Sequence, residues 1–569
     1  MEICLEQAIP TYSGGLGVLA GDTLRSAADL GVPMSAISLV HRKGYFHQHL
    51  DQNGNQTEEP EPWRPEDVLE LVPERVTVNI EGRDVLVRAW RYTVIGVDGH
   101  TVPVYLLDTN LPENSDWDRT LTDYLYGGDS RYRLCQEVVL GMGGAELVRA
   151  LGDDVATQFH INEGHAALLM LTLLERQLAV SDHRVPTDAD VDAVRAQCIF
   201  TTHTPVPAGH DRFPEAQVRS VLGDARTDLL IAGGCCDGGD DESWLNMTRL
   251  ALRFSRYVNG VAMRHREVSQ GMFPNYSVES ITNGVHAVTW TSPPFRELFD
   301  RRIPRWRHDN LYLRYAVGIP LEEIREAHVR AKHALLDEVA RRTGTQLDPA
   351  VMTIGFARRS TPYKRADLIF SDVQRLRAIS SGAGAMQIVF AGKAHPRDEG
   401  GKELIRHIFR AAHELDGRLR VVYLENYEMD LGALLTSGVD LWLNNPMKPL
   451  EASGTSGMKA AINGVPSLSV LDGWWVEGHV EGITGWSIGN AEAAAPDSTA
   501  EAHDMYTKLE RSIIPLFYGL PLAWAEVMRH AIALNGSFFN TQRMVGQYVR
   551  DAYSAFGERR ESGVMVGAR

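Results

Sequence analysis

Short apolar runs bounded by glycine, proline or polar residues alternate along this chain with helix-forming stretches. Such an alternation is typical of parallel sheets covered by helices. The runs fall into two series, which predict an α/β fold with two doubly wound domains. The expected strands are Pro33–Val40, Val102–Leu107, Thr157–Ile161 and Gln197–Thr201 in the first half, and Val351–Phe356, Gln387–Ala391, Arg418–Leu424 and Val439–Leu443 in the second.

Length and composition predict how these series divide into domains. A chain of 569 residues with 44% hydrophobic residues can bury more than one large core. We expect a first domain over residues 1–310, a helical connection over 311–348 and a second domain over 349–498. C-terminal helices over 499–569, broken at Gly519-Leu520-Pro521, should pack back toward the first domain.

Two local segments add to this outline. The glycine-rich segment Gly233–Asp241 predicts a flexible surface loop. The chain begins inside what should be a first strand, Met1–Cys4, so we expect the true start codon to lie upstream.

Charge and motif content exclude several classes of protein. The formal net charge of −17, with Lys and Arg scattered, gives no attraction for nucleic acid. No apolar run reaches the roughly 18–20 residues of a membrane span, and the first residues lack the basic flank and apolar stretch of a signal peptide. Five cysteines without CxxC spacing, and the absence of HExxH, predict no disulfide framework and no metal. We expect a soluble, cytoplasmic protein without nucleic-acid or membrane partners, and homo-oligomerisation stays open.

A glycine-rich turn, Tyr12–Asp22, leads into an expected helix. Because Gly14, Gly15 and Gly17 lack Cβ atoms, their backbone N–H groups can approach an anion at the helix N-terminus. The turn fits neither GxxxxGK[ST] nor GxGxxG, and a purely structural turn is an equal alternative.

Four cations follow the expected strand Val351–Phe356. Ligands of α/β sheets bind at the carboxyl ends of the strands, and Arg together with Lys suits phosphate. A solvated basic loop is the alternative. The cations are Arg358, Arg359, Lys364 and Arg365.

A third cluster, Glu451–Ala461, combines small and hydroxyl-bearing residues with a single lysine. Glu451 can accept hydrogen bonds from sugar hydroxyls. Lys459 stands at an apolar helical start, so its amine can enter a dry site where a Schiff base can form. A plain helix N-terminus with a solvent-facing lysine is the alternative.

Together these clusters resemble the glycogen and α-glucan phosphorylase family, in particular its short bacterial and archaeal branch of maltodextrin phosphorylase-like enzymes. The resemblance runs in order over nearly the whole chain. The matching stretches are Gly14–Gly17, Phe159–His165, Thr202–Thr204, Asn246-Met247, Val258–Ala262, Ile281–Val285, Arg359 with Tyr363–Arg365, Leu424–Tyr427 and Glu451–Lys459.

The resemblance implies two Rossmann-like domains facing across a cleft, the GT-B type of glycosyltransferase fold. It implies phosphorolysis of an α-1,4-glucan or maltodextrin, with retention, to give α-D-glucose 1-phosphate. Its coenzyme is pyridoxal 5′-phosphate, covalently bound to Lys459, whose phosphate donates and accepts a proton beside the substrate phosphate. The implied catalytic residues are Lys459, Arg359, Lys364 and His203; the coenzyme contacts are Lys459, Thr455, Ser456, Tyr427, Arg358, Trp290 and Gly15; and the substrate contacts are Gly15, Leu16, Gly17, Asn283, Glu451, Ser453, Gly454 and, by motif position alone, His165.

This chain also departs from the long members of the family. They carry Gly-Asn where this chain has Ser456-Gly457, and their gating loop is longer than the stretch Tyr126–Asp129. Their large N-terminal helical region, with its phosphorylation and nucleotide sites, has no counterpart here, so allosteric sites are expected to be absent. Preferred glucan length therefore stays open.

Two other functions compete with this interpretation. A nucleotide-sugar glycosyltransferase of the same fold, similar to glycogen synthase, would also use residues at Lys364, Arg365 and Glu451, but it needs no pyridoxal lysine. A non-catalytic glucan-binding protein is suggested only by Trp474-Trp475, and adjacent tryptophans are more often core residues.

Overall fold

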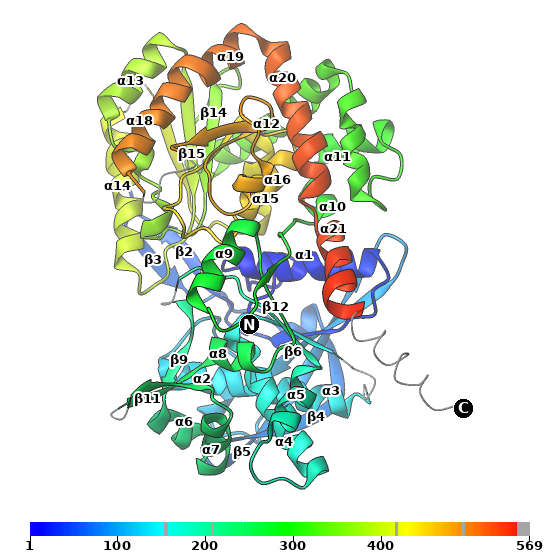
Figure 1. The fold of residues 1–569 in the computed structure, drawn as a ribbon. Helices are drawn as coiled ribbons and strands as arrows, with labels where there is room; N and C mark the ends of the chain where they lie inside the picture. Colours follow the sequence, from blue (N-terminus) through cyan, green and yellow to red (C-terminus); the bar gives the residue numbers. More distant parts are fainter. Residues whose placement is uncertain (153–157, 207–208, 240–241, 416–418, 491–495, 555–569) are drawn as a thin grey trace, which may run out of the picture. The chain divides into compact units, whose positions relative to one another are not determined.

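The computed structural model describes residues 1–152, 158–206, 209–239, 242–415, 419–490 and 496–554. Spatial contacts divide the chain into two compact units (Figure 1). Unit 1 contains Met1–Tyr45, Glu61–Thr282 and Val545–Arg569, and unit 2 contains Phe46–Pro60 and Asn283–Met544. The domain limits expected from the sequence stay a prediction.

Unit 2 is built on a six-stranded parallel sheet with the order β16-β15-β14-β17-β18-β19. This is the 3-2-1-4-5-6 order of a doubly wound sheet, in which the winding reverses between β14 and β17. Every residue of β14 and β15 is buried, because helices cover both faces. The four strands expected in this half are confirmed, although Arg418 lies outside the described residues. The strands are β14 (Met352–Ala357), β15 (Met386–Ala391), β16 (Arg420–Leu424), β17 (Leu441–Asn444), β18 (Ser467–Val470) and β19 (Gly485–Ile488).

Helices flank this sheet on two sides. Figure 1 shows α13, α14 and α18 beside one face and α12, α15 and α16 beside the other. The break expected in the C-terminal helices is confirmed, since α19 ends at Gly519 and α20 begins at Pro521. The helices are α12 (Leu321–Thr343), α13 (Val373–Gly382), α14 (Glu399–Leu415), α15 (Met429–Gly438), α16 (Thr455–Ile462), α18 (Ser498–Lys508), α19 (Ile514–Gly519), α20 (Pro521–His530) and α21 (Thr541–Gln547).

Unit 1 holds a parallel sheet, β13-β12-β8-β7, and a mixed sheet, β1-β6-β5-β4. The strands expected in this half are present, with Thr157 outside the described residues, but they divide between the two sheets. β1 pairs with β6 in parallel, whereas β5 pairs antiparallel with both β4 and β6. The strands are β1 (Ala36–Leu39), β4 (Glu70–Ile80), β5 (Arg83–Ile95), β6 (Thr101–Asp108), β7 (Phe159–Asn162), β8 (Cys198–Thr201), β12 (Tyr257–Gly260) and β13 (Glu279–Ser280).

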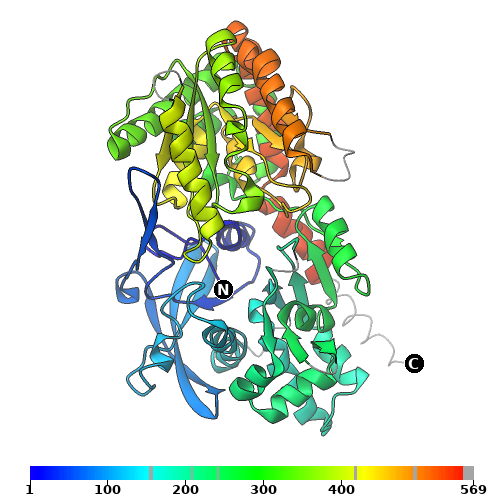
Figure 2. The ribbon, with the colours of Figure 1, turned by 90° about the vertical axis from the view of Figure 1, so that its left-hand side faces the viewer.

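The long β4–β5 hairpin is the main element of unit 1 that the sequence analysis missed (Figure 2). Its two-residue turn consists of Glu81 and Gly82, with φ of 53° and 74°. Positive φ at both central residues is the type I′ geometry that fits the twist of paired strands. A glutamate at the first of these positions is unusual, which hid the turn signal.

Two local expectations are wrong. Within Gly233–Asp241, residues Cys236–Gly239 form a strand, β10, that pairs with β11 (Glu242–Asn246) instead of a loop, while residues 240–241 lie outside the described residues. Met1–Cys4 joins no strand of the described sheets, because the Cys4 amide donates instead to the carbonyl of Gly17 at 2.9 Å. In the part of the chain that the structure describes, every helix is too short or too polar to cross a bilayer.

Candidate active site

Side chains from three strand ends of unit 2 are joined by hydrogen bonds. Arg358 follows β14 directly, and its guanidinium donates to the amide oxygen of Asn444, the last residue of β17. The Asn444 amide donates in turn to Ser469 Oγ on β18 at 3.0 Å. Because β14 and β17 flank the reversal of the sheet, these groups lie where doubly wound sheets bind their ligands.

A buried carboxylate, Glu451, binds two of the expected phosphate-site cations. Its Oε2 accepts hydrogen bonds from Arg358 Nη2 and from Lys364 Nζ, both at 2.6 Å. Burial would raise the pKa of Glu451, but the charges of Arg358 and Lys364 outweigh it and hold the pKa at about 2. The carboxylate is therefore ionised and keeps both cations in place.

The other two cations of this segment have different positions. Arg359 is exposed, next to the paired Arg358. Arg365 is buried, pairs with Glu501 at 2.6 Å and donates to the carbonyl of Asn445 at 2.9 Å. Arg365 thus has a structural role, while Arg358 and Lys364 share one partner, Glu451, which the sequence analysis had not linked to them.

Lys459 is buried on α16, against an aromatic ring. Its Nζ lies 3.5 Å from the ring centroid of Trp290, the last residue of α10 (Ala287–Trp290). Asn463 ties the two together, because its amide donates to the carbonyls of Trp290, at 2.8 Å, and Lys459, at 3.0 Å. The solvent-facing alternative for this lysine is wrong, and Asn463 is a positioning residue that no sequence signal marked.

The turn before α16 is shaped by Trp474. Gly454 has φ of 91°, a conformation that favours glycine, and the Trp474 amide donates to the carbonyl of Ser453 at 2.8 Å. A Cβ atom at Gly457 would lie 2.8 Å from the Trp474 ring, so the helix start packs directly on this indole. Trp474 and Trp475 are both core residues, which removes the motive for the glucan-binding alternative.

Two buried polar atoms near these elements lack protein partners. Ser453 Oγ and Asn283 Oδ1 accept or donate no hydrogen bond among the described residues. Leaving a buried polar group unpaired costs about 1–3 kcal/mol, so both atoms are available to bond a ligand or a water molecule. Ser456, by contrast, has a partner, because its Oγ accepts a hydrogen bond from Trp442 Nε1 at 3.2 Å. The other two expected coenzyme contacts of this half lie at helix starts: Thr455 is the first residue of α16, and Tyr427 is buried just before α15.

In unit 1, the glycine turn forms the start of α1 (Gly15–Asp29) as expected. Gly15 is exposed and Leu16 is half-buried, whereas Gly17 is buried against Glu2. A Cβ atom at Gly21 would lie 1.9 Å from the carbonyl oxygen of Cys4. The glycines at 17 and 21 therefore serve close packing, and the open glycine is Gly15.

His203 follows β8 and is held by the end of β7. Its Nε2 lies 2.9 Å from Asn162 Oδ1, and its backbone N–H donates to the Glu163 carboxylate. Glu163 is buried with φ of 60°, a strained conformation for a residue with a side chain. Burial raises the pKa of Glu163 to about 7, although the hydrogen bond from His203 acts against it. Glu163 belongs to the matched stretch Phe159–His165, but the sequence analysis did not identify its hydrogen bond with the His203 backbone.

Replacing Glu163 with Gln should remove a pH dependence of stability. The carboxyl pKa rises from 4.5 to about 7 on folding, so the folded protein holds the proton more tightly. The stabilisation from the protonated Glu163 carboxyl is complete below pH 4.5. It is lost as the pH rises to 7, which lowers the free energy of unfolding by about 3 kcal/mol. Melting temperatures from pH 5 to 8 should fall more steeply in the wild type than in Glu163→Gln. The exposed Glu113→Gln is the control and should follow the wild type; parallel curves for Glu163→Gln would contradict the expectation.

The family model for carbohydrate phosphorylases matches residues 238–483 of this chain. The chain is 40% identical to the maltodextrin phosphorylase of Thermococcus litoralis, over 97% of this chain and 70% of that protein. It is 37% identical to the glycogen phosphorylase of Mycobacterium tuberculosis, over 100% and 72%. It is 36% identical to the glycogen phosphorylase of Aquifex aeolicus, over 97% and 85%.

Proposed function

The chain belongs to the carbohydrate phosphorylase family, and from that premise we propose that it uses inorganic phosphate to release α-D-glucose 1-phosphate, with retention, from an α-1,4-glucan or maltodextrin. It is a hexosyltransferase of the glycogen and maltodextrin phosphorylase type. The observation that supports the reaction best is the pair of cations held on Glu451 at the reversal point of the unit 2 sheet.

The fold that we propose is of the GT-B type, with two Rossmann-like domains facing across a cleft. The strand order of unit 2 supports this assignment for its own half.

The coenzyme of the proposed reaction is pyridoxal 5′-phosphate, which the family generally uses. The residues present fit it: Lys459 offers a buried amine against the Trp290 ring, and Ser453 Oγ is a buried polar atom with no partner among the described residues. We propose that Lys459 binds the coenzyme covalently and that Thr455, Ser456, Tyr427, Arg358, Trp290 and Gly15 contact it. When bound, the coenzyme supplies a phosphate that exchanges a proton with the substrate phosphate.

The chain's own residues bind and orient the reactants in this proposal. Arg358, Arg359 and Lys364 supply positive charge for two phosphates that would otherwise repel each other. Glu451 accepts hydrogen bonds from sugar hydroxyls, and His203 contributes polar groups beside the developing positive charge on the sugar. The remaining proposed substrate contacts are Gly15, Leu16, Gly17, Asn283, Ser453, Gly454 and His165.

The second candidate function, nucleotide-sugar-dependent glucan synthesis, accounts for the cations but not for the buried Lys459. Incubation with maltodextrin and phosphate should release α-glucose 1-phosphate, whereas UDP-glucose or ADP-glucose should not extend maltodextrin. Chain growth from a nucleotide sugar, without phosphorolysis, would replace the proposal with the synthase alternative.

A further inference from the structure

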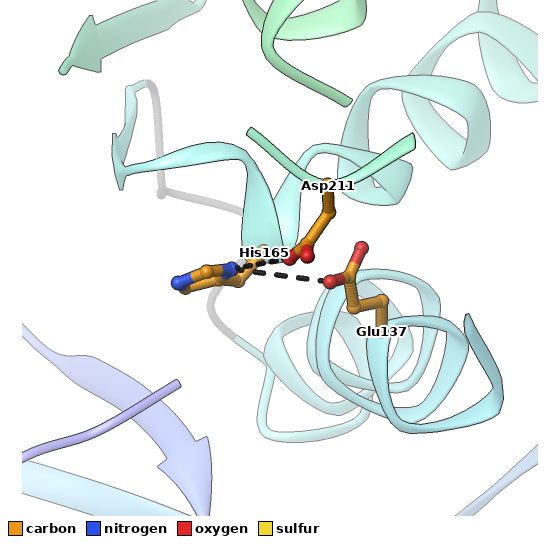
Figure 3. Close-up of side chains that lie close together, drawn as sticks. All are labelled: Glu137, His165 and Asp211. Atoms are coloured by element: carbon orange, nitrogen blue, oxygen red, sulfur yellow. Dashed lines mark hydrogen bonds and ion pairs between the residues drawn. The ribbon is translucent and has the colours of Figure 1, made fainter. Parts of the chain in front are cut away.

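Four charged or titratable side chains meet in unit 1 around His165. Arg133 and Glu137 lie on α2 (Ser130–Val138), His165 on the turn after β7, and Asp211 directly before β9 (Arg212–Pro214). Figure 3 shows one ring nitrogen of His165 facing the two carboxylates and the other pointing away from them. Metal-ligating atoms of Glu137, His165 and Asp211 lie within 4.8 Å of one another.

A guanidinium fills the place that a metal ion would need. Arg133 Nη2 lies 2.9 Å from Asp211 Oδ2 and 3.0 Å from His165 Nδ1, and Arg133 Nε lies 3.1 Å from Glu137 Oε1. Burial, helped by the nearby charge of Asp211, raises the pKa of Glu137 well above its usual range. Arg133 therefore contacts all three of the other side chains and supplies a positive charge between the two carboxyl groups.

These contacts also decide how His165 is oriented. Its Nδ1 lies 3.1 Å from Asp211 Oδ2, and a charge-assisted hydrogen bond to that carboxylate needs a proton on Nδ1. Arg133 already donates to the same oxygen, so it does not need the imidazole as an acceptor. The rings of Tyr126 and His165 pack edge to face, at 6.1 Å between centroids, and the Arg133 guanidinium lies over the Tyr126 ring. The imidazole is thus fixed in orientation from two sides.

We propose that Asp211, itself held by Arg133, positions His165 with Nδ1–H directed into the cluster and Nε2 presented as a hydrogen-bond acceptor for a hydroxyl group of the bound glucosyl unit. Asp211 is a positioning residue, since it acts through His165. The sugar contact rests on the proposed function, whereas the tautomer is a property of the protein alone.

The tautomer can be measured directly. In the full chain labelled with ¹⁵N-histidine, the His165 signals, identified by their loss in His165→Gln, should show a protonated Nδ1 and an unprotonated Nε2 at neutral pH. Asp211→Ala should shift the proton toward Nε2, because Arg133 then donates to Nδ1. Asp211→Asn keeps an oxygen acceptor and should keep the wild-type tautomer, and the exposed Asp192→Ala serves as a matched control. A wild-type ring protonated on Nε2 would overturn the proposal, even if Asp211→Ala fails to fold.

Kinetics separate this role from a structural one. Asp211→Ala should raise the KM for maltodextrin about tenfold with little change in kcat, because a substrate contact is lost in ground and transition states alike. Asp211→Asn should restore most of the affinity. A stoichiometric metal ion in the purified wild type that is lost in Asp211→Ala would overturn the proposal. The expected tautomer in a protein without phosphorolysis would count against the proposed function and leave the positioning intact.

Discussion

Lys459→Arg should lose covalently bound coenzyme and lower the rate of phosphorolysis at least about a thousandfold, or about 4 kcal/mol. Arginine keeps its proton at any working pH, so it cannot form a Schiff base. It can still place a cation over the Trp290 ring, which Lys459 contacts at 3.5 Å. Packing around α16 should therefore survive, and the loss of activity can be assigned to coenzyme attachment.

Borohydride reduction followed by mass spectrometry measures the attachment. A pyridoxyl adduct should appear on Lys459 of the wild type and be missing from Lys459→Arg. The matched control is Lys402→Arg. Lys402 lies on α14 and its Nζ is 2.9 Å from a carboxylate oxygen of Glu58, so the variant should keep both the adduct and the activity. Full activity in Lys459→Arg would contradict the proposed chemistry.

The unit 2 sheet could be predicted from sequence because burial on both faces leaves a strong local signal. Every residue of β14 is buried, and all residues of Met352–Ala357 except Thr353 are apolar or glycine. The β4–β5 hairpin could not be predicted in the same way, since the second half of β4 is buried only at every second residue, at Val76, Val78 and Ile80. That alternation is the signal of a half-exposed strand, and searching for continuous apolar runs overlooks it.

The contacts that organise the candidate site are long-range, and this limits what motifs can give. Lys364 and Glu451 each belong to a matched motif, yet they are 87 residues apart, and only the fold shows that they touch. The same holds for Arg133 and Asp211, which are 78 residues apart. Motifs therefore supplied candidate residues, whereas their pairing and charge states came from the structure.

Lys364→Ala should lower kcat/KM for phosphate about 10–150-fold, the value of one charge-assisted contact. Folding stability should fall as well, because Lys364 Nζ lies 2.6 Å from the buried Glu451 carboxylate, and its loss leaves Arg358 as the one cation on that carboxylate among the described residues. We expect a loss of about 1–3 kcal/mol of folding stability. Arg359→Ala is the matched variant. Because Arg359 is exposed, its loss should leave the melting temperature the same. The phosphate kinetics should still suffer, because Arg359 belongs to the proposed phosphate site.

A double variant separates the two effects of Lys364. In the double variant, Lys364→Ala with Glu451→Gln, the side chain that lost its cation is a neutral amide instead of a carboxylate. The double variant should therefore lose less folding stability than the sum of the losses in the two single variants. Phosphate kinetics should remain impaired, because the cation is still missing. Thermal melts and phosphate-dependent rates at saturating maltodextrin measure both quantities on the same samples. Additive losses of stability would show that Lys364 and Glu451 are not coupled, and wild-type phosphate kinetics in folded Lys364→Ala would remove this cation from the proposed phosphate site.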